Sequence, residues 1–292
     1  MLDVSDESRF ITAGDGLRLH YREYNAAYSG SATPLVCMAG LARTAMDFDI
    51  LAKAIAFAPN QNRRVIAIDY RGRGLSDRDR NWRNYDMRVE NADILSILAA
   101  ARIEQAVFLG TSRGGLHIMM LGATRPGAIR AAILNDIGPV IEAKGLMRIR
   151  GYIGKLPQPS SWDDAVQLAK QLMSAQFTGL REDEWRVYAG LTFEEQKGKL
   201  VPRYDPALSK PLAEMNLEQG APVLWPQFDG LRNVPLLAIR GENSDLFSQE
   251  TQEAMAARHP SCETYTVTGQ GHAPLLLDQQ SIERIRQFAS RF

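Results

Sequence analysis

Residues 105–115 read QAVFLGTSRGG, and this stretch decides the fold. Its first six residues form an apolar run typical of a buried strand, and a helical pattern begins directly after Ser112. A strand-to-helix turn this tight crowds the positions two residues before and two residues after its centre. Those positions must be small, and Gly110 and Gly114 meet that demand. The pattern predicts that the turn lifts the Ser112 hydroxyl clear of the sheet as a nucleophile.

Two other interpretations of these glycines are weaker. One is a helix N-cap serine whose neighbouring glycines allow close packing. The other is a dinucleotide-binding loop, with Asp136 after the next strand as the ribose-binding acid. The segment reads Gly-Thr-Ser-Arg-Gly-Gly rather than Gly-x-Gly-x-x-Gly. It therefore lacks the second glycine, which lets a backbone approach a pyrophosphate.

Apolar strand patterns alternate with helical patterns on both sides of Ser112. We expect strands at residues 9–12, 17–24, 34–39, 64–69, 105–110, 130–135, 234–240 and 264–267, the first two forming a hairpin around Asp15-Gly16. Continuous apolar strands separated by helices indicate a parallel sheet covered on both faces. The prediction is an α/β fold with a doubly wound, mostly parallel, eight-stranded sheet.

The strand pattern stops between residues 139 and 230. We expect helices there at residues 161–175, 182–190 and 206–219, and three of the four tryptophans lie in this region, Trp162, Trp185 and Trp225. Strands resume beyond it, which disfavours a separate helical domain. We therefore predict one core domain, residues 1–138 and 231–292, with residues 139–230 inserted after the sixth strand as a helical cap.

A serine hydroxyl needs a general base, and the chain has four histidines. His272 lies in the glycine-rich loop GQGHAP, residues 269–274, after the last expected strand. Open α/β sheets place their sites in loops of this kind. The other three have structural explanations, as a surface residue of the hairpin, a hydrogen-bonded core residue and a helix-end residue: His20, His117 and His259. His272 is therefore the predicted base.

The base needs an orienting carboxylate, and two aspartates directly follow expected strands. Asp245 ends the segment RGENSD after the strand at 234–240, and it is the first candidate. Asp136 follows the strand at 130–135 and is the alternative acid. Either residue also has a structural explanation, Asp245 in an Asx turn or helix cap and Asp136 as a loop cap.

Five segments, in this order, resemble the α/β-hydrolase superfamily over essentially the whole chain. They are MAGLART (38–44), DYRGRGLSD (69–77), GTSRGG (110–115), RGENSD (240–245) and GQGHAP (269–274). The similarity is to the serine branch with a helical cap, which includes esterases, enol-lactonases and carbon–carbon bond hydrolases. A serine in the turn argues against haloalkane dehalogenases and epoxide hydrolases, which use aspartate there.

The resemblance implies a triad of Ser112, His272 and Asp245, and an oxyanion hole from the backbone amides of Leu41 and Arg113. The family often has His-Gly where this chain has Ala39-Gly40. An amide donor does not depend on that side chain, so we expect the oxyanion hole to be retained. Substitution of Asp245 by Asn should then abolish most activity, and the same change at Asp136 should matter little.

The implied activity is hydrolysis of a carboxylic ester or lactone of a small, partly apolar substrate through an acyl-enzyme. Amide or carbon–carbon bond hydrolysis by the same triad is the alternative, and a non-catalytic receptor or scaffold is a third. Arg43 and Arg113 flank the expected site, where they either bind a substrate carboxylate or pair internally. Five aromatic residues either line the pocket or form the core of the cap: Trp162, Phe177, Trp185, Phe193 and Trp225.

Composition limits the partners. Lys plus Arg and Asp plus Glu are each 34, so nothing calls for a nucleic acid or an anionic membrane. The first ten residues, MLDVSDESRF, do not resemble a secretory signal, and no apolar run approaches about 20 residues. Cys37 and Cys262 are expected to be free thiols. We expect a cytoplasmic, cofactor-free and metal-free enzyme of a small-molecule substrate, either monomer or homodimer.

Overall fold

A computed structural model describes residues 6–215 and 223–292. Its centre is an eight-stranded sheet in the order β1-β2-β4-β3-β5-β6-β9-β10. The bounds are β1 Asp6–Thr12, β2 Arg18–Tyr24, β3 Leu35–Met38, β4 Val65–Asp69, β5 Ala106–Thr111, β6 Ile129–Asn135, β9 Leu236–Gly241 and β10 Cys262–Val267. β2 pairs antiparallel with β1 and β4, and the other pairs are parallel. The predicted α/β class and mostly parallel eight-stranded sheet are confirmed.

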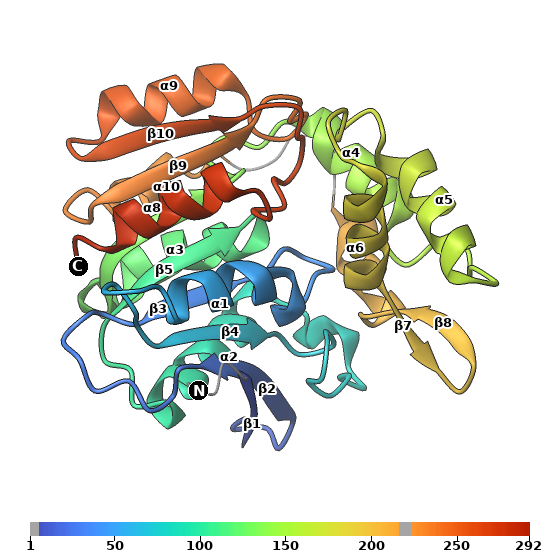
Figure 1. Cartoon of the computed structure of the whole chain (residues 1–292), viewed down its shortest axis with the longest axis horizontal. Coiled ribbons are helices and arrows are strands. Elements are labelled where there is room, and N and C mark those ends of the chain that lie inside the picture. The colour runs from blue at the N-terminus through green and yellow to red at the C-terminus, as the bar shows by residue number, and fades with distance from the viewer. Residues whose placement is uncertain (1–5, 216–222) are drawn as a thin grey trace.

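Helices cover both faces of this sheet (Figure 1). One layer contains α2 (Met87–Ala100), α3 (Arg113–Thr124), α8 (Trp225–Asp229) and α9 (Gln249–Arg258), and the other contains α1 (Asp49–Ala56) and α10 (Gln279–Ala289). Alternation along each strand produces the two layers. In β3, Val36 and Met38 pack with the first layer, and Leu35 and Cys37 pack with the second. Such strands carry apolar residues at every position, which is why their sequence pattern was continuous.

The chain leaves the sheet between β6 and β9. The helices there are α4 (Ala143–Tyr152), α5 (Trp162–Met173), α6 (Glu182–Thr192) and α7 (Ser209–Glu214), and a small antiparallel sheet joins β7 (Phe193–Gln196) to β8 (Lys199–Pro202). Figure 1 shows α4, α5, α6, β7 and β8 standing together beside one end of the large sheet. We call the described part of residues 139–215 the insertion. α8, which the sequence placed with this region, packs against α3 in the first helix layer.

Two sequence expectations for the insertion differ from the structure. The β7–β8 hairpin was not predicted, because its strands are four residues each and rich in charged side chains. The helix expected at 206–219 is instead a short 3₁₀ turn, η4 (Pro206–Leu208), followed by α7, which ends at Glu214. Residues 216–219 of that prediction lie outside the described residues. Three further 3₁₀ turns are η1 (Ala45–Phe48), η2 (Trp82–Asn84) and η3 (Pro126–Ala128).

The insertion has an apolar core of its own. Phe177, Trp185 and Phe193 are buried in it, and Trp185 meets Phe177 edge-on with ring centroids 6.4 Å apart. Trp162 is exposed, and Trp225 packs on Phe228 beside α3. Most of the aromatic residues that the sequence singled out therefore stabilise the insertion itself.

Two expectations from composition can be compared with the structure. Cys37 is buried and Cys262 is half-buried, and both are free thiols, as expected. In the two described stretches, no helix combines the length and the apolar character needed to cross a membrane.

Candidate active site

Ser112 lies in the turn that joins β5 to α3, as the sequence predicted. Its backbone has φ 51° and ψ −112°, in a region that non-glycine residues rarely adopt. A Cβ on Gly110 would lie 2.3 Å from the carbonyl carbon of Gly114, and one on Gly114 would lie 2.1 Å from the Met38 carbonyl oxygen. Only glycine fits at either position, so the steric explanation of the five-residue pattern is correct.

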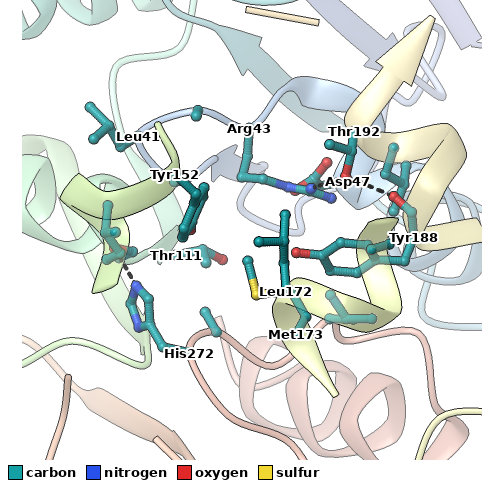
Figure 2. A pocket seen from close by; sticks show the side chains of 18 of the residues that line it. Leu41, Arg43, Asp47, Thr111, Tyr152, Leu172, Met173, Tyr188, Thr192 and His272 are labelled. Carbon is teal, nitrogen blue, oxygen red and sulfur yellow. Dashed lines mark hydrogen bonds and ion pairs between the residues drawn. The ribbon is translucent and has the colours of Figure 1, made fainter. Parts of the chain in front are cut away.

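The structure brings Ser112 and His272 into direct contact. The Nε2 atom of His272 lies 2.9 Å from Ser112 Oγ, and Figure 2 draws this contact as the dashed line at His272. The loop that carries His272 is held from the insertion, because Gln176 Oε1 accepts a hydrogen bond of 2.9 Å from the His272 backbone amide. The other ring nitrogen of His272, Nδ1, meets an acidic side chain.

That acid is Asp136, and the expectation that Asp245 contacts His272 is wrong. Asp136 Oδ2 lies 2.8 Å from His272 Nδ1, and the aspartate is fully buried. Its backbone φ of 57° turns the chain sharply at the end of β6. The Gly241 amide donates to its Oδ1 at 2.7 Å, and the Ser244 hydroxyl donates to its Oδ2 at 2.6 Å. Asp136 is therefore held in one orientation beneath the histidine.

Asp245 instead pairs with Arg148 of α4. The pair is bidentate, with Nε to Oδ2 at 2.7 Å and Nη2 to Oδ1 at 2.8 Å. Burial alone would raise the pKa of Asp245, but its hydrogen bonds to Arg148 hold that pKa below its ordinary value. Asp245 thus joins the insertion to the loop after β9. Nothing in the sequence near Asp245 indicates this partner, because Arg148 carries no motif.

Leu41 and Arg113 border Ser112 from two different loops. Arg113 is the first residue of α3, where helix N-terminal amides carry a partial positive charge. Leu41 follows Gly40, and a Cβ on Gly40 would lie 3.8 Å from Ser112 Cβ. Among the described residues, neither the Leu41 amide nor the Arg113 amide donates a hydrogen bond to another backbone or side-chain group. Both amides are therefore available to a ligand beside Ser112.

A pocket opens in front of Ser112 and His272. Its floor comes from the sheet loops, and its walls come from α4, α5 and α6 of the insertion (Figure 2). Aliphatic and aromatic side chains dominate the walls, including Ile149, Leu172 and Met173. Phe177 and Phe193 reach the pocket from the core of the insertion, whereas Trp162, Trp185 and Trp225 are not among its lining residues. The pocket therefore suits a partly apolar ligand.

Arg43 forms a polar patch in this pocket. Its Nε donates to Asp47 Oδ2 at 2.6 Å and its Nη1 donates to Thr192 Oγ1 at 2.9 Å, as Figure 2 shows. Its guanidinium also lies over the Tyr188 ring, 5.1 Å from the centroid. Burial raises the pKa of Asp47, although the charge of Arg43 opposes that rise. Arg43 Nη2 and Asp47 Oδ1 are buried without a hydrogen-bond partner among the described residues.

Arg113 does not share this position. Its side chain is absent from the pocket lining, and its Nε donates to Glu90 Oε2 at 2.6 Å. Of the two arginines that the sequence placed beside the site, Arg43 faces the pocket and Arg113 is paired internally. An alternative role for the Arg113 side chain as the partner of a substrate carboxylate is therefore contradicted.

The remaining histidines are structural. His117 is buried, with Nδ1 3.1 Å from Asn91 Oδ1, as expected for a core histidine. His259 Nε2 donates to the Leu231 carbonyl at 2.8 Å. His20 was expected at the surface, but it is buried with Nδ1 2.7 Å from Asp69 Oδ2. Within residues 6–215 and 223–292, no group of three or more His, Cys, Asp or Glu side chains is arranged to hold a metal ion.

Comparison with known proteins gives a family match and similar proteins of nearly the same length. A family model described as the alpha/beta hydrolase fold matches residues 33–279. The chain is 30% identical over 296 residues to 3-hydroxybutyrate-oligomer hydrolase of Cupriavidus necator, which covers 98% of this chain and 99% of that protein. It is 25% identical over 264 residues to esterase YbfF of Escherichia coli, covering 88% of this chain and 92% of that protein.

A solved structure agrees with these sequence matches. The crystal structure of an alpha/beta hydrolase from Novosphingobium aromaticivorans superimposes with a TM-score of 0.90 at 36% sequence identity. The superposition covers 98% of this chain and 99% of that one, so it includes the insertion as well as the sheet.

Proposed function

The chain belongs to the α/β-hydrolase fold family and is a hydrolase, and we propose that it cleaves a carboxylic ester or lactone of a small, partly apolar substrate. The observation that carries this proposal is the hydrogen-bonded series Ser112–His272–Asp136, which ends in an apolar pocket. Because the family and its similar members are hydrolases and esterases, a non-catalytic scaffold is not retained.

His272 is the general base of the proposed reaction. Its Nε2 takes the proton of Ser112 as the serine oxygen attacks the substrate carbonyl, and the same proton then goes to the leaving alcohol. Asp136 accepts from Nδ1–H, so it selects the tautomer in which Nε2 carries the lone pair. Water then attacks the acyl-enzyme with His272 again as the base, which releases the acid and restores Ser112.

The amides of Leu41 and Arg113 form the proposed oxyanion hole. They come from the loop after β3, where Gly40 lies beside Ser112, and from the N-terminus of α3, which begins directly after Ser112. Negative charge develops on the carbonyl oxygen in the tetrahedral intermediate, and donors positioned beforehand stabilise it more than they stabilise the substrate. The Ala39 side chain plays no part in this step.

The insertion, residues 139–215, forms the described part of the proposed cap, which thus ends before α8, and α4, α5 and α6 supply the walls that choose the substrate. The contacts of Gln176 with the His272 loop and of Arg148 with Asp245 are among the hydrogen bonds that support a cap fastened to the core. We propose that Arg43 binds a polar group of the substrate at the far wall. Because Asp47 balances the charge of Arg43, the patch suits a neutral hydroxyl better than a carboxylate.

The apolar walls together with the Arg43–Asp47 pair favour esters of hydroxy acids as the first substrates to test. A hydroxyl group can accept from Arg43 Nη2 and donate to Asp47 Oδ1, two of the buried atoms that lack a partner among the described residues. The similar protein from Cupriavidus necator is named for hydrolysis of 3-hydroxybutyrate oligomers. Amide or carbon–carbon bond hydrolysis through the same three residues is the alternative.

Labelling with a fluorophosphonate probe tests the nucleophile. We expect labelling of the wild type and none of Ser112→Ala, with Ser160→Ala, an exposed serine of the insertion, as the matched control. Absence of labelling in the wild type, or equal labelling of Ser112→Ala, would refute the proposal. Hydrolysis of nitrophenyl esters, 3-hydroxybutyrate dimers, lactones and amides by the wild type then decides the class of bond.

A further inference from the structure

One buried carboxylate connects to both residues of the proposed oxyanion hole. Glu90 lies in the first turn of α2 and is fully buried. Arg73 Nη1 donates to its Oε1 at 2.7 Å, and Arg113 Nε donates to its Oε2 at 2.6 Å. His117 Nε2 lies 3.1 Å from the same Oε2. Each oxygen of Glu90 therefore holds a different arginine.

The two arginines lead to the two loops that border Ser112. Arg113 is itself the residue after the serine, so its side chain anchors the start of α3. Arg73 donates a second hydrogen bond, from Nε to the backbone carbonyl of Leu41, at 2.8 Å. Leu41 and Arg113 belong to different loops, and Glu90 connects them through one arginine on each side.

Anchoring Leu41 matters because Gly40 precedes it. Glycine leaves the backbone free to rotate, and the Leu41 amide direction depends on that rotation. The hydrogen bond from Arg73 holds the carbonyl of Leu41 in place. It therefore limits how far the amide of Leu41 can turn. Arg73 is fully buried and uses the fixed fork of its guanidinium to reach Leu41 and Glu90 together, which a lysine cannot do.

The charges in this cluster keep it intact at neutral pH. Burial alone would raise the pKa of Glu90, but the charges of Arg113 and Arg73 hold that pKa well below its ordinary value. Burial lowers the pKa of His117, whose Nε2 lies 3.1 Å from Glu90 Oε2. Glu90 thus stays ionised between two permanently charged partners.

We propose that Glu90 is a positioning residue that holds the Leu41 and Arg113 amides in the geometry required by the oxyanion. This inference rests on the proposed hydrolase mechanism and extends it beyond the serine, histidine and aspartate. Glu90 does not touch the substrate, and it acts through Arg73 and Arg113. Because the oxyanion forms only in the transition state, loss of Glu90 should lower kcat and leave KM nearly unchanged.

Asp93 offers a matched control on the same helix. It is also a buried carboxylate paired with an arginine, since both of its oxygens accept from Arg71, at 2.6 and 2.8 Å. Neither Asp93 nor the Arg71 side chain forms a hydrogen bond with Leu41 or Arg113 in the described chain. Removing either charge disturbs a buried ion pair, but of the two carboxylates only Glu90 accepts hydrogen bonds from the Arg73 and Arg113 side chains.

The test compares Glu90→Gln with Asp93→Asn in steady-state hydrolysis of p-nitrophenyl butyrate, with thermal unfolding of each variant to confirm that it is folded at the assay temperature. We expect kcat of Glu90→Gln to fall about 10- to 100-fold, less than the 10²- to 10³-fold typical of deleting one donor. KM should change less than about threefold, and kcat of Asp93→Asn should stay within about threefold of wild type. Equal kcat in the two variants would overturn the inference. So would a loss of kcat/KM in Glu90→Gln that comes from a raised KM rather than from a lowered kcat.

Glu90→Asp covers the case in which Glu90→Gln does not fold. It keeps the charge but shortens the side chain, so it cannot reach both arginines, and we expect the same selective fall in kcat. Unchanged kcat in folded Glu90→Asp would also overturn the inference. A wild type that hydrolyses no ester and takes no fluorophosphonate would instead refute the proposed function, so the two failures are distinguishable.

Discussion

Asp136 Oδ2 lies 2.8 Å from His272 Nδ1. Asp136 directly follows β6, and the sequence favours it only as the alternative acid. The first-ranked residue, Asp245, lies in the loop after β9 and gives both oxygens to Arg148. Both aspartates follow strands at the same edge of the sheet. Their contacts, rather than their positions along the chain, distinguish an acid for His272 from an anchor for the cap.

The two aspartates should therefore respond differently to substitution, in the order opposite to the one expected from the sequence. Asp136→Asn should lower kcat by roughly 10⁴-fold, because an amide no longer selects the correct tautomer of His272. Asp245→Asn should lower kcat less than about tenfold, because its partner is Arg148. Steady-state kinetics on a nitrophenyl ester measures both, with circular dichroism to confirm folding. A larger loss in Asp245→Asn would return the acid to that residue.

The glycines of the nucleophile turn should not tolerate a side chain. Gly114→Ala would place a Cβ 2.1 Å from the Met38 carbonyl oxygen, and this clash is with backbone of β3, which cannot move aside as the end of a flexible side chain can. We expect a loss of about 1–3 kcal/mol or more in the free energy of unfolding, as in other overpacked sites. Gly127→Ala is the control, because nothing lies within 4 Å of its added Cβ. Urea unfolding should show the loss at Gly114 alone, and equal stabilities would contradict the steric account.

Arg43 should discriminate between substrates. If Arg43 Nη2 and Asp47 Oδ1 hold a substrate hydroxyl, Arg43→Met should reduce kcat/KM for a 3-hydroxybutyrate ester about 10- to 100-fold more than for the matching butyrate ester. That ratio corresponds to the about 1.5–3 kcal/mol typical of a hydrogen bond to a charged group. The butyrate ester is the internal control, because general damage to the cap lowers kcat/KM for both esters together. An unchanged ratio would remove Arg43 from substrate recognition.

The depressed pKa of Glu90 predicts how acid affects stability. Its pKa when folded lies well below its ordinary value of 4.5, so its ionised form stabilises the fold. That contribution is complete above about pH 5 and is lost as the pH falls from 4.5 through the folded pKa. Wild type should therefore exceed Glu90→Gln in free energy of unfolding at neutral pH, and the difference should shrink in acid. Urea unfolding at several pH values measures it, and a difference that grows in acid would contradict the sign.

The sequence by itself determined the sheet, and it predicted the proposed nucleophile and the proposed base. Buried parallel strands carry continuous apolar runs, so their positions are readable without knowing their neighbours. The turn around Ser112 is also local, because Gly110 and Gly114 are excluded from having side chains by atoms of the turn and of the adjacent strand. His272 was found because its loop combines glycines with a position after the last strand.

Only the tertiary structure decided which aspartate meets His272 and which contacts anchor the insertion to the sheet. The choice of Asp136 depends on a backbone turn with φ 57° and on Arg148, which the insertion brings to Asp245 from a distant part of the chain. Glu90 reaches the loops of Leu41 and Arg113 through two arginines that share no motif with it. Hydrogen bonds and ion pairs depend on distances of about 3 Å, and such distances are set by packing, which residue spacing along the chain does not record.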